Sequence, residues 1–307
     1  VPVPKGYTAS SIATENTVVD GFVIYEGEEG VNEENKDTAQ TTRNQFVWVP
    51  VANPSEMYGT DSNGKKWGKL YSFASTGITP RNWTEQDGVM SVTDATSNRE
   101  PDIVTNYDGN DATFDASSFI STIGNITGAQ FKTQLESEFN SMIESVEKYG
   151  GFYIGRYETG NLSQEEAVVV KNNEDINNQT WYTHYNKSKG VAANSNVTTT
   201  MIWGCQWDAV MRWMYNSGDN EKKKYTYDST GKGNYGTISP IATGSNNNYA
   251  VNNIYDMAGN AYDWTIKASG TAFRIGCGGC YKYSASYNPA SNSCRQRSCE
   301  QRAIQWQ

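Results

Sequence analysis

The stretch Asn253-Ile-Tyr-Asp-Met-Ala-Gly-Asn-Ala-Tyr-Asp-Trp-Thr265 interleaves carboxylates, a glycine and aromatic residues. Asp256 and Asp263 stand seven positions apart around Gly259, so a bend at the glycine would bring both carboxylates and the intervening carbonyl groups together. Oxygen atoms arranged in this way suit a small hard cation such as calcium. The alternative is a turn held by hydrogen bonds alone. The stretch therefore predicts a structural turn, held either by a bound cation or by hydrogen bonds alone.

The same segment resembles the Asp-Met-x-Gly-Asn-Val-Trp-Glu-Trp signature of the formylglycine-generating enzyme family. Two further pieces match in order: Gly150-Gly-Phe-Tyr-Ile-Gly-Arg-Tyr-Glu158 resembles an early strand of the family, and Phe273-Arg274 followed by Gly278-Gly279 resembles its Arg-x-x-x-Gly-Gly-Ser segment. The resemblance covers the chain from about Gly150 onward. It implies an α+β, C-type-lectin-like fold with short twisted antiparallel strands, two main helices and long loops.

The resemblance also implies a set of calcium ligands in the turn. The family's ligand positions fall on Asp256, the carbonyl groups of Gly259 and Ala261, and Asp263. The sequence departs from the family at Asp263, where the family has glutamate, and at Tyr262, where it has tryptophan. An ion in this turn would be a structural calcium, and the alternative remains a turn held by hydrogen bonds alone. We expect no organic cofactor.

Composition limits the classes of partner. The formal charge of −9 and the pI near 4.8 argue against a nucleic-acid backbone, because phosphate binding needs clustered Lys and Arg. No stretch approaches the roughly 20 apolar residues that a membrane span requires, so we expect no membrane anchor in this chain. Aromatic residues make up 12% of the chain and charged residues only 19%, which favours loop-rich structure with aromatic surfaces.

We expect a single C-type-lectin-like domain over residues 1–307, with a loop-rich insertion at 52–128 and a C-terminal ligand-binding segment at 272–307. Apolar residues at spacings of three and four predict helices over 129–149, ended by Gly150, and over 206–215. Other elements follow from shorter patterns: strands at 22–25, 45–51, 152–157 and 167–170, a short helix at 183–193, and a loop at 216–252 that includes the basic run 222–224. A final core strand near 302–306 is predicted only if the tail is an ordinary loop.

Four of the five cysteines, Cys277, Cys280, Cys294 and Cys299, lie in the last 31 residues. Their C-x2-C-x13-C-x4-C spacing approaches that of a four-thiolate zinc site, although the second half lacks the usual tight knuckle. Two disulfides and free thiols are the alternatives.

The oxidases of the resembled family bind copper through two cysteines, four and nine residues after the second glycine of the Gly-Gly pair. Here those positions are Tyr283 and Asn288, so neither of the family's two copper-binding positions carries a thiolate. His184 is the only histidine, which excludes sites that need two imidazoles. We expect no enzymatic activity; the alternative is a divergent copper oxidase or another enzyme on the same scaffold.

The segment from Gly276 to about Gln301 resembles the variable region of proteins diversified by retroelements, in which Asn codons scatter to residues such as Cys, Ser, Tyr, Gly and Arg. It follows Phe-Arg, contains Gly-Gly and retains Asn288-Pro-Ala-Ser-Asn292. The alternative is an ordinary loop with a final core strand. The predicted ligand-binding positions, with tyrosines as aromatic anchors and the others as substitutable surface positions, are Cys277, Cys280, Tyr281, Lys282, Tyr283, Ser284, Ser286, Tyr287, Cys294, Gln296, Ser298 and Cys299.

These features together predict a non-catalytic ligand-binding protein, either an adhesin or a receptor-binding protein. We expect it to be extracellular, on a bacterial cell surface or a phage particle. Its expected partner is a protein or glycan on another cell or surface, and not a nucleic acid.

Overall fold

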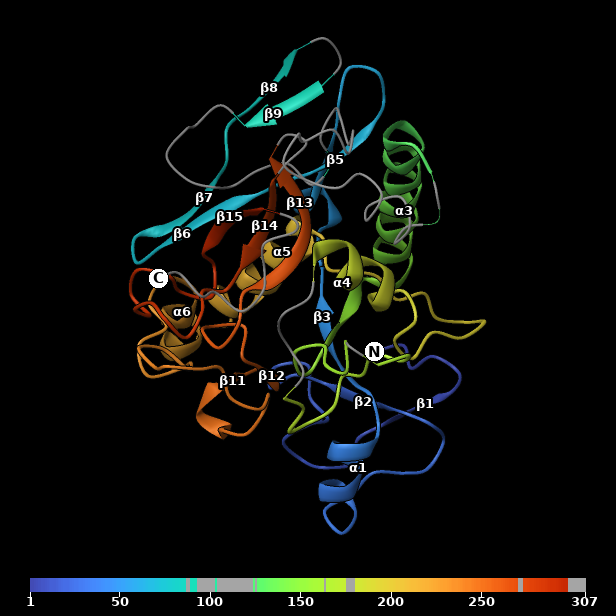
Figure 1. Ribbon diagram of the computed structural model, residues 1–307, viewed down its shortest axis with the longest axis vertical. Helices are drawn as coiled ribbons and strands as arrows, with labels where there is room; N and C mark the ends of the chain where they lie inside the picture. The colour runs from blue at the N-terminus through green and yellow to red at the C-terminus, as the bar shows by residue number, and fades with distance from the viewer. Residues whose placement is uncertain are drawn as a thin grey trace.

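The computed structural model describes residues 1–86, 89–92, 103, 124, 126–162, 164–174, 180–269 and 273–297 (Figure 1). These residues form helices and several small antiparallel sheets, which confirms the predicted α+β class. No helix in these ranges is long and apolar enough to cross a membrane.

The first sheet has the strand order β1-β2-β3-β10, and each neighbouring pair is antiparallel. Its strands are β1 (Tyr7–Ala9), β2 (Val23–Glu26), β3 (Gln45–Pro50) and β10 (Gly151–Gly155), with helix α1 (Lys36–Thr42) between β2 and β3. The strands predicted at 22–25, 45–51 and 152–157 are confirmed. The strand predicted at 167–170 is wrong, because there the chain makes only an isolated bridge between Gly160 and Val168.

The long helix predicted at 129–149 is α3 (Gly128–Tyr149). A capping box begins it, in which Thr127 accepts from the Gln130 backbone and the Gln130 side chain accepts from the Thr127 backbone. Gly150 ends it with a left-handed φ of 78°. The buried face consists of residues at the predicted spacing: Phe131, Leu135, Phe139, Ile143 and Val146.

Three shorter helices follow: α4 (Trp181–Ser188), α5 (Gly204–Tyr215) and α6 (Asn220–Tyr227). The first two match helices expected from the sequence. Helix α6 corrects the prediction of a loop at 216–252. Asp219 caps it by accepting from the backbone of Glu221 and Lys222, and its inner face buries Tyr225, so the basic run lies on a helix.

The first part of the predicted insertion is a series of hairpins in the upper half of the view in Figure 1. The short helix η1 (Pro54–Glu56) precedes them, and the paired strands are β4 (Tyr58–Thr60) with β5 (Lys66–Gly68), β6 (Tyr71–Ala74) with β7 (Gly77–Pro80), and β8 (Trp83–Gln86) with β9 (Val89–Val92). Lys65 forms an ion pair of 2.5 Å with Glu136 on α3. Most of the rest of the insertion lies outside the described residues.

The C-terminal sheet has the order β13-β14-β15, with β13 (Asp263–Ser269), β14 (Phe273–Cys277) and β15 (Ser293–Arg297). The helix η2 (Asn247–Tyr249) and the small pair β11 (Ala250–Val251) and β12 (Ile254–Tyr255) precede it. Trp264 and Ile266 pack in a core with α3, whereas Ile275 and Cys277 pack in a second core with α5. The sheet therefore has apolar cores on both faces. The final strand predicted near 302–306 lies outside the described residues.

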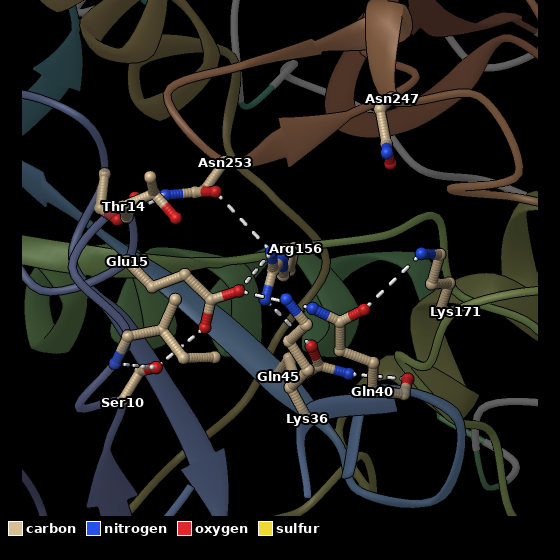
Figure 2. Close-up of polar contacts among 12 residues, drawn as sticks. Ser10, Thr14, Glu15, Lys36, Gln40, Gln45, Arg156, Lys171, Asn247 and Asn253 are labelled. Atoms are coloured by element: carbon tan, nitrogen blue, oxygen red, sulfur yellow. Dashed lines mark hydrogen bonds and ion pairs between the residues drawn. The ribbon is translucent and has the colours of Figure 1, made fainter. Parts of the chain in front are cut away.

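A buried polar network ties the N-terminal segment to the first sheet (Figure 2). Arg156 forms an ion pair of 2.7 Å with Glu15 and donates to Tyr25 at 2.9 Å and to Gln45 at 3.2 Å. Ser10 and Gln40 also donate to the Glu15 carboxylate. The charges are paired and hydrogen-bonded, which is the condition for burying them at moderate cost.

Candidate functional site

The candidate site is the loop of residues 278–292, which joins β14 to β15 and contains much of the predicted ligand-binding segment. The base of the loop is closed where the backbone of Gly278 donates to Asn292 at 3.1 Å. Gly278 and Gly279 have φ values of 89° and 82°. A Cβ on Gly279 would lie 2.5 Å from the carbonyl oxygen of Asn288, so this tight start of the loop requires glycine.

Hydrogen bonds from neighbouring segments hold the backbone of the loop. Tyr281 donates to the carbonyl of Asn260 and accepts from the backbone of Thr237, both at 2.9 Å. Further along the loop, Ala290 donates to the hydroxyl of Ser229 at 2.9 Å and accepts from the indole of Trp207 at 3.0 Å. The loop is therefore fixed near both ends by contacts that do not depend on its own side chains.

The tip of the loop presents side chains to solvent. Tyr287 is 86% exposed and Tyr283 is 44% exposed. Lys282, Ser284 and Ser286 are exposed as well. These five positions are where the sequence analysis predicts a binding surface.

The prediction of surface exposure is wrong for Cys277, Cys280 and Tyr281, which are 0%, 2% and 8% exposed. Cys277 is the last residue of β14 and points into the core that includes α5. The side chains of Cys280 and Tyr281 pack against Tyr262 on the inner side of the loop. The backbones of Cys294 and Gln296 lie in β15, whereas their side chains, Ser298 and Cys299 lie outside the described part of the structure.

Cys277 belongs to a buried polar group on one face of the C-terminal sheet. Its sulfur lies 3.5 Å from the hydroxyl oxygen of Ser293, its cross-strand neighbour. The ammonium of Lys267, which is fully buried, donates to the same hydroxyl at 2.8 Å. In the part of the chain that the structure describes, Cys205, Cys277 and Cys280 are not joined in disulfide bonds.

The turn predicted from residues 253–265 lies directly under the loop. Asp256, Gly259 and Asn260 have positive φ values of 59°, 79° and 54°, which makes this an unusually bent segment. The carboxylate of Asp256 accepts from the hydroxyl of Thr243 at 2.9 Å and from the backbone of Gly244 at 2.8 Å. Hydrogen bonds therefore support the turn, as one of the two alternatives requires.

A third carboxylate, which the sequence analysis missed, reaches the turn from another part of the chain. Glu158 follows β10, accepts from the side-chain amide of Asn260 at 2.6 Å and accepts from the backbone of Ala261 at 3.3 Å. Glu158 lies at the end of the Gly150 to Glu158 segment that resembles the family's early strand, but nothing in its local sequence indicates a partner about a hundred residues away.

Burial sets the protonation behaviour of this cluster. It raises the pKa of Glu158 well above its ordinary value, and the neighbouring charges of Asp256 and Asp263 raise it further. Burial, followed by the charge of Asp256, raises the pKa of Asp263 in the same way. Burial also raises the pKa of Asp256, against the opposing hydrogen bonds from Gly244 and Thr243. The cluster is therefore a place where extra positive charge would be stabilising.

Two observations bear on the fit of calcium to this turn. Oδ2 of Asp263 is buried and has no hydrogen-bond partner among the described residues. A Cβ on Gly278 would lie 3.3 Å from that oxygen and 2.4 Å from the carbonyl oxygen of Met257, so glycine leaves space beside both oxygens. These oxygens suit a hard cation.

Side chains alone do not make a metal site here. Within the described ranges, no group of three or more His, Cys, Asp or Glu side chains could hold a metal ion. A calcium ion would therefore need carbonyl oxygens, such as those predicted at Gly259 and Ala261, in addition to the carboxylates of Asp256 and Asp263. Calcium stays a prediction, and so does the zinc alternative, which needs Cys294 and Cys299.

Comparisons with protein-family models, with curated protein sequences and with solved structures give no match to this chain.

Proposed function

We propose that this chain is a non-catalytic ligand-binding protein whose loop 278–292 is the binding surface. The observation that carries the proposal is that the loop combines a fixed backbone with exposed side chains. Its backbone is tied to Asn260, Thr237 and Ser229, while Lys282 and four other side chains around the tip are exposed.

A fixed backbone with exposed side chains suits a surface that recognises a partner. A loop whose backbone is already ordered loses little conformational entropy on binding, which favours affinity. Tyrosine and serine are the residues that adaptable binding loops use, because tyrosine offers a large rigid contact area and serine offers hydrogen bonds. Substitutions at the exposed positions would alter recognition without removing the contacts that hold the loop.

The wider setting of the proposal follows from the sequence. We place the chain outside the cell, on a bacterial surface or a phage particle, as an adhesin or a receptor-binding protein. We assign it a C-type-lectin-like scaffold of the formylglycine-generating-enzyme type with a diversified C-terminal segment. The mixed α+β architecture and the bent turn under the loop are compatible with that scaffold.

The binding role can be tested by replacing the exposed tip. A loop variant carries alanine at Lys282, Tyr283, Ser284, Ser286 and Tyr287. A control variant carries alanine at Val19, Glu28 and Glu34, which are exposed residues in the N-terminal part of the chain.

The probes are a glycan microarray and a random-peptide phage library selected on the unmodified protein. We expect the loop variant to lose the selected binding and the control to keep it, with similar melting temperatures for all three proteins. Retained binding by a folded loop variant would rule out the proposal.

The diversification hypothesis has a separate test in the sequences of several copies of this gene. We expect differences to concentrate between residues 276 and 301. Within the described part of that segment they should fall on exposed positions such as Lys282 and Tyr287, and they should spare Cys277 and Cys280, because burial restricts substitution there. Differences spread evenly along the chain would contradict the hypothesis.

A further inference from the structure

A second loop, formed by residues 228–246, lies against the binding loop. The backbone of Gly236 donates to Tyr283 at 3.2 Å, and the backbone of Thr237 donates to Tyr281 at 2.9 Å. Ile238 follows immediately and is 98% exposed, the highest value among the large apolar residues described. An almost fully exposed isoleucine therefore lies next to the loop that exposes Tyr283 and Tyr287.

The exposure of Ile238 comes from a fixed backbone. On one side, the hydroxyl of Thr237 donates to the side chain of Asn234 at 2.8 Å. On the other side, the carbonyl of Ser239 accepts from the side chain of Asn234 at 3.1 Å. Ile241 donates to the side chain of Asn260 at 2.8 Å, which joins this second loop to the turn that also holds Tyr281. The two loops therefore share one support, Asn260.

The charge on the two loops differs from that of the whole chain. The second loop contains Lys232 and one acid, Asp228, whose carboxylate pairs with Lys224 of α6 at 3.7 Å, and the binding loop contains Lys282 and no Asp or Glu. The chain as a whole carries a formal charge of −9. The two loops thus form a mildly basic surface with exposed apolar side chains on an acidic protein, and such a surface favours a partner with negative charge.

We propose that the two loops form one composite interface, with Ile238 as its apolar anchor, and that the occupant is a protein surface with exposed apolar side chains bordered by carboxylates. This inference rests on the proposed binding function. Isoleucine has no hydrogen-bonding group, so it adds affinity only where a partner buries it against apolar atoms. The hydroxyl groups of a glycan would gain little from it, whereas an apolar side chain of a protein would.

The test uses a random-peptide phage library selected on the intact protein. Ile238→Asp is compared with Val19→Asp, which places the same charge at another exposed aliphatic residue, and with Tyr287→Ala in the binding loop. We expect the selected peptides to combine Leu, Phe or Trp with Asp or Glu. Ile238→Asp should weaken their binding at least about tenfold, as expected for an anchor residue. Val19→Asp should leave binding unchanged, and added salt should weaken binding to the unmodified protein.

The outcomes separate this inference from the proposed function. If Tyr287→Ala weakens binding and Ile238→Asp does not, the composite interface is overturned and the binding role of the loop stands. If neither variant changes binding, both proposals fail. If loop-dependent binding is found only on a glycan microarray, the protein partner is overturned and the binding function remains.

Discussion

The side-chain amide of Asn260 donates a 2.6 Å hydrogen bond to the carboxylate of Glu158, and both residues are buried. The side-chain oxygen of Asn260 accepts from Asn234 at 3.1 Å and from the backbone of Ile241 at 2.8 Å. Its carbonyl accepts from Tyr281. One residue therefore links the segment after β10 to both loops of the proposed interface.

Replacing Asn260 should destabilise the fold. Asn260→Ala leaves the buried carboxylate of Glu158 without its closest donor and places alanine at a φ of 54°. We expect a loss of about 2 to 4 kcal/mol in the free energy of unfolding, measured by urea denaturation. Asn248→Ala, at an exposed asparagine, is the control and should change stability little. Equal stabilities would show that the link is dispensable.

The buried carboxylates predict an unusual pH dependence in metal-free buffer. Because the folded pKa values of Glu158 and Asp263 are raised, the folded protein binds more protons than the unfolded chain above the ordinary carboxyl pKa of about 4. Their contribution to stability is therefore present below that pH and is lost as the pH rises through the folded values. Urea denaturation at a series of pH values should show this decline, and Asp263→Asn should reduce it. A decline of the same size in Asp263→Asn would assign it to other groups.

Calcium should offset that loss at neutral pH. A cation beside the orphaned oxygen of Asp263 binds only the folded protein, so calcium at a hundred times its dissociation constant would add about 2.7 kcal/mol of stability. The measurement is the melting temperature with calcium and with a chelator. Asp263→Asn should remove the difference. If calcium does not shift the melting temperature of the unmodified protein, the turn is held by hydrogen bonds alone.

Replacing only one partner of the ion pair between Glu15 and Arg156 should lower the free energy of unfolding strongly. Arg156→Met leaves a buried carboxylate without its charge partner, and we expect a loss of about 3 to 5 kcal/mol in urea denaturation. The double variant Glu15→Leu with Arg156→Met should lose less than Arg156→Met alone, because no charge is left buried. Lys36→Met, which removes the exposed pair with Glu33, should cause no measurable change.

Ser293→Ala tests the buried group around Lys267. The change removes the hydroxyl that accepts from the buried ammonium and contacts the thiol of Cys277. We expect a loss of about 1 to 3 kcal/mol, measured by urea denaturation. Ser286→Ala makes the same change at an exposed serine of the loop and should have little effect. Equal effects of the two changes would contradict a structural role for the Lys267 contact.

Helices with a clear apolar periodicity could be predicted from local patterns in the sequence. The apolar spacing of α3, its Thr127 cap and the glycine at 150 are all contained within one segment, so they could be recognised without the fold. The bend around Gly259 was also predictable, because a glycine between closely spaced polar residues indicates a turn. Helix α6 was missed because its weak apolar pattern does not indicate one, although its Asp219 cap is also local.

Only the tertiary structure decided what lies around these elements. Cys277 and Cys280 were expected at the surface because their segment resembles a variable region, yet Cys277 points into the core and the side chain of Cys280 packs against Tyr262 on the inner side of the loop. Glu158 meets Asn260, and Ile238 comes to lie beside the binding loop, through contacts between segments distant in the sequence. Periodicity reports which face of an element is apolar, but burial and pairing depend on which other segments cover that face, and a single sequence does not contain that information.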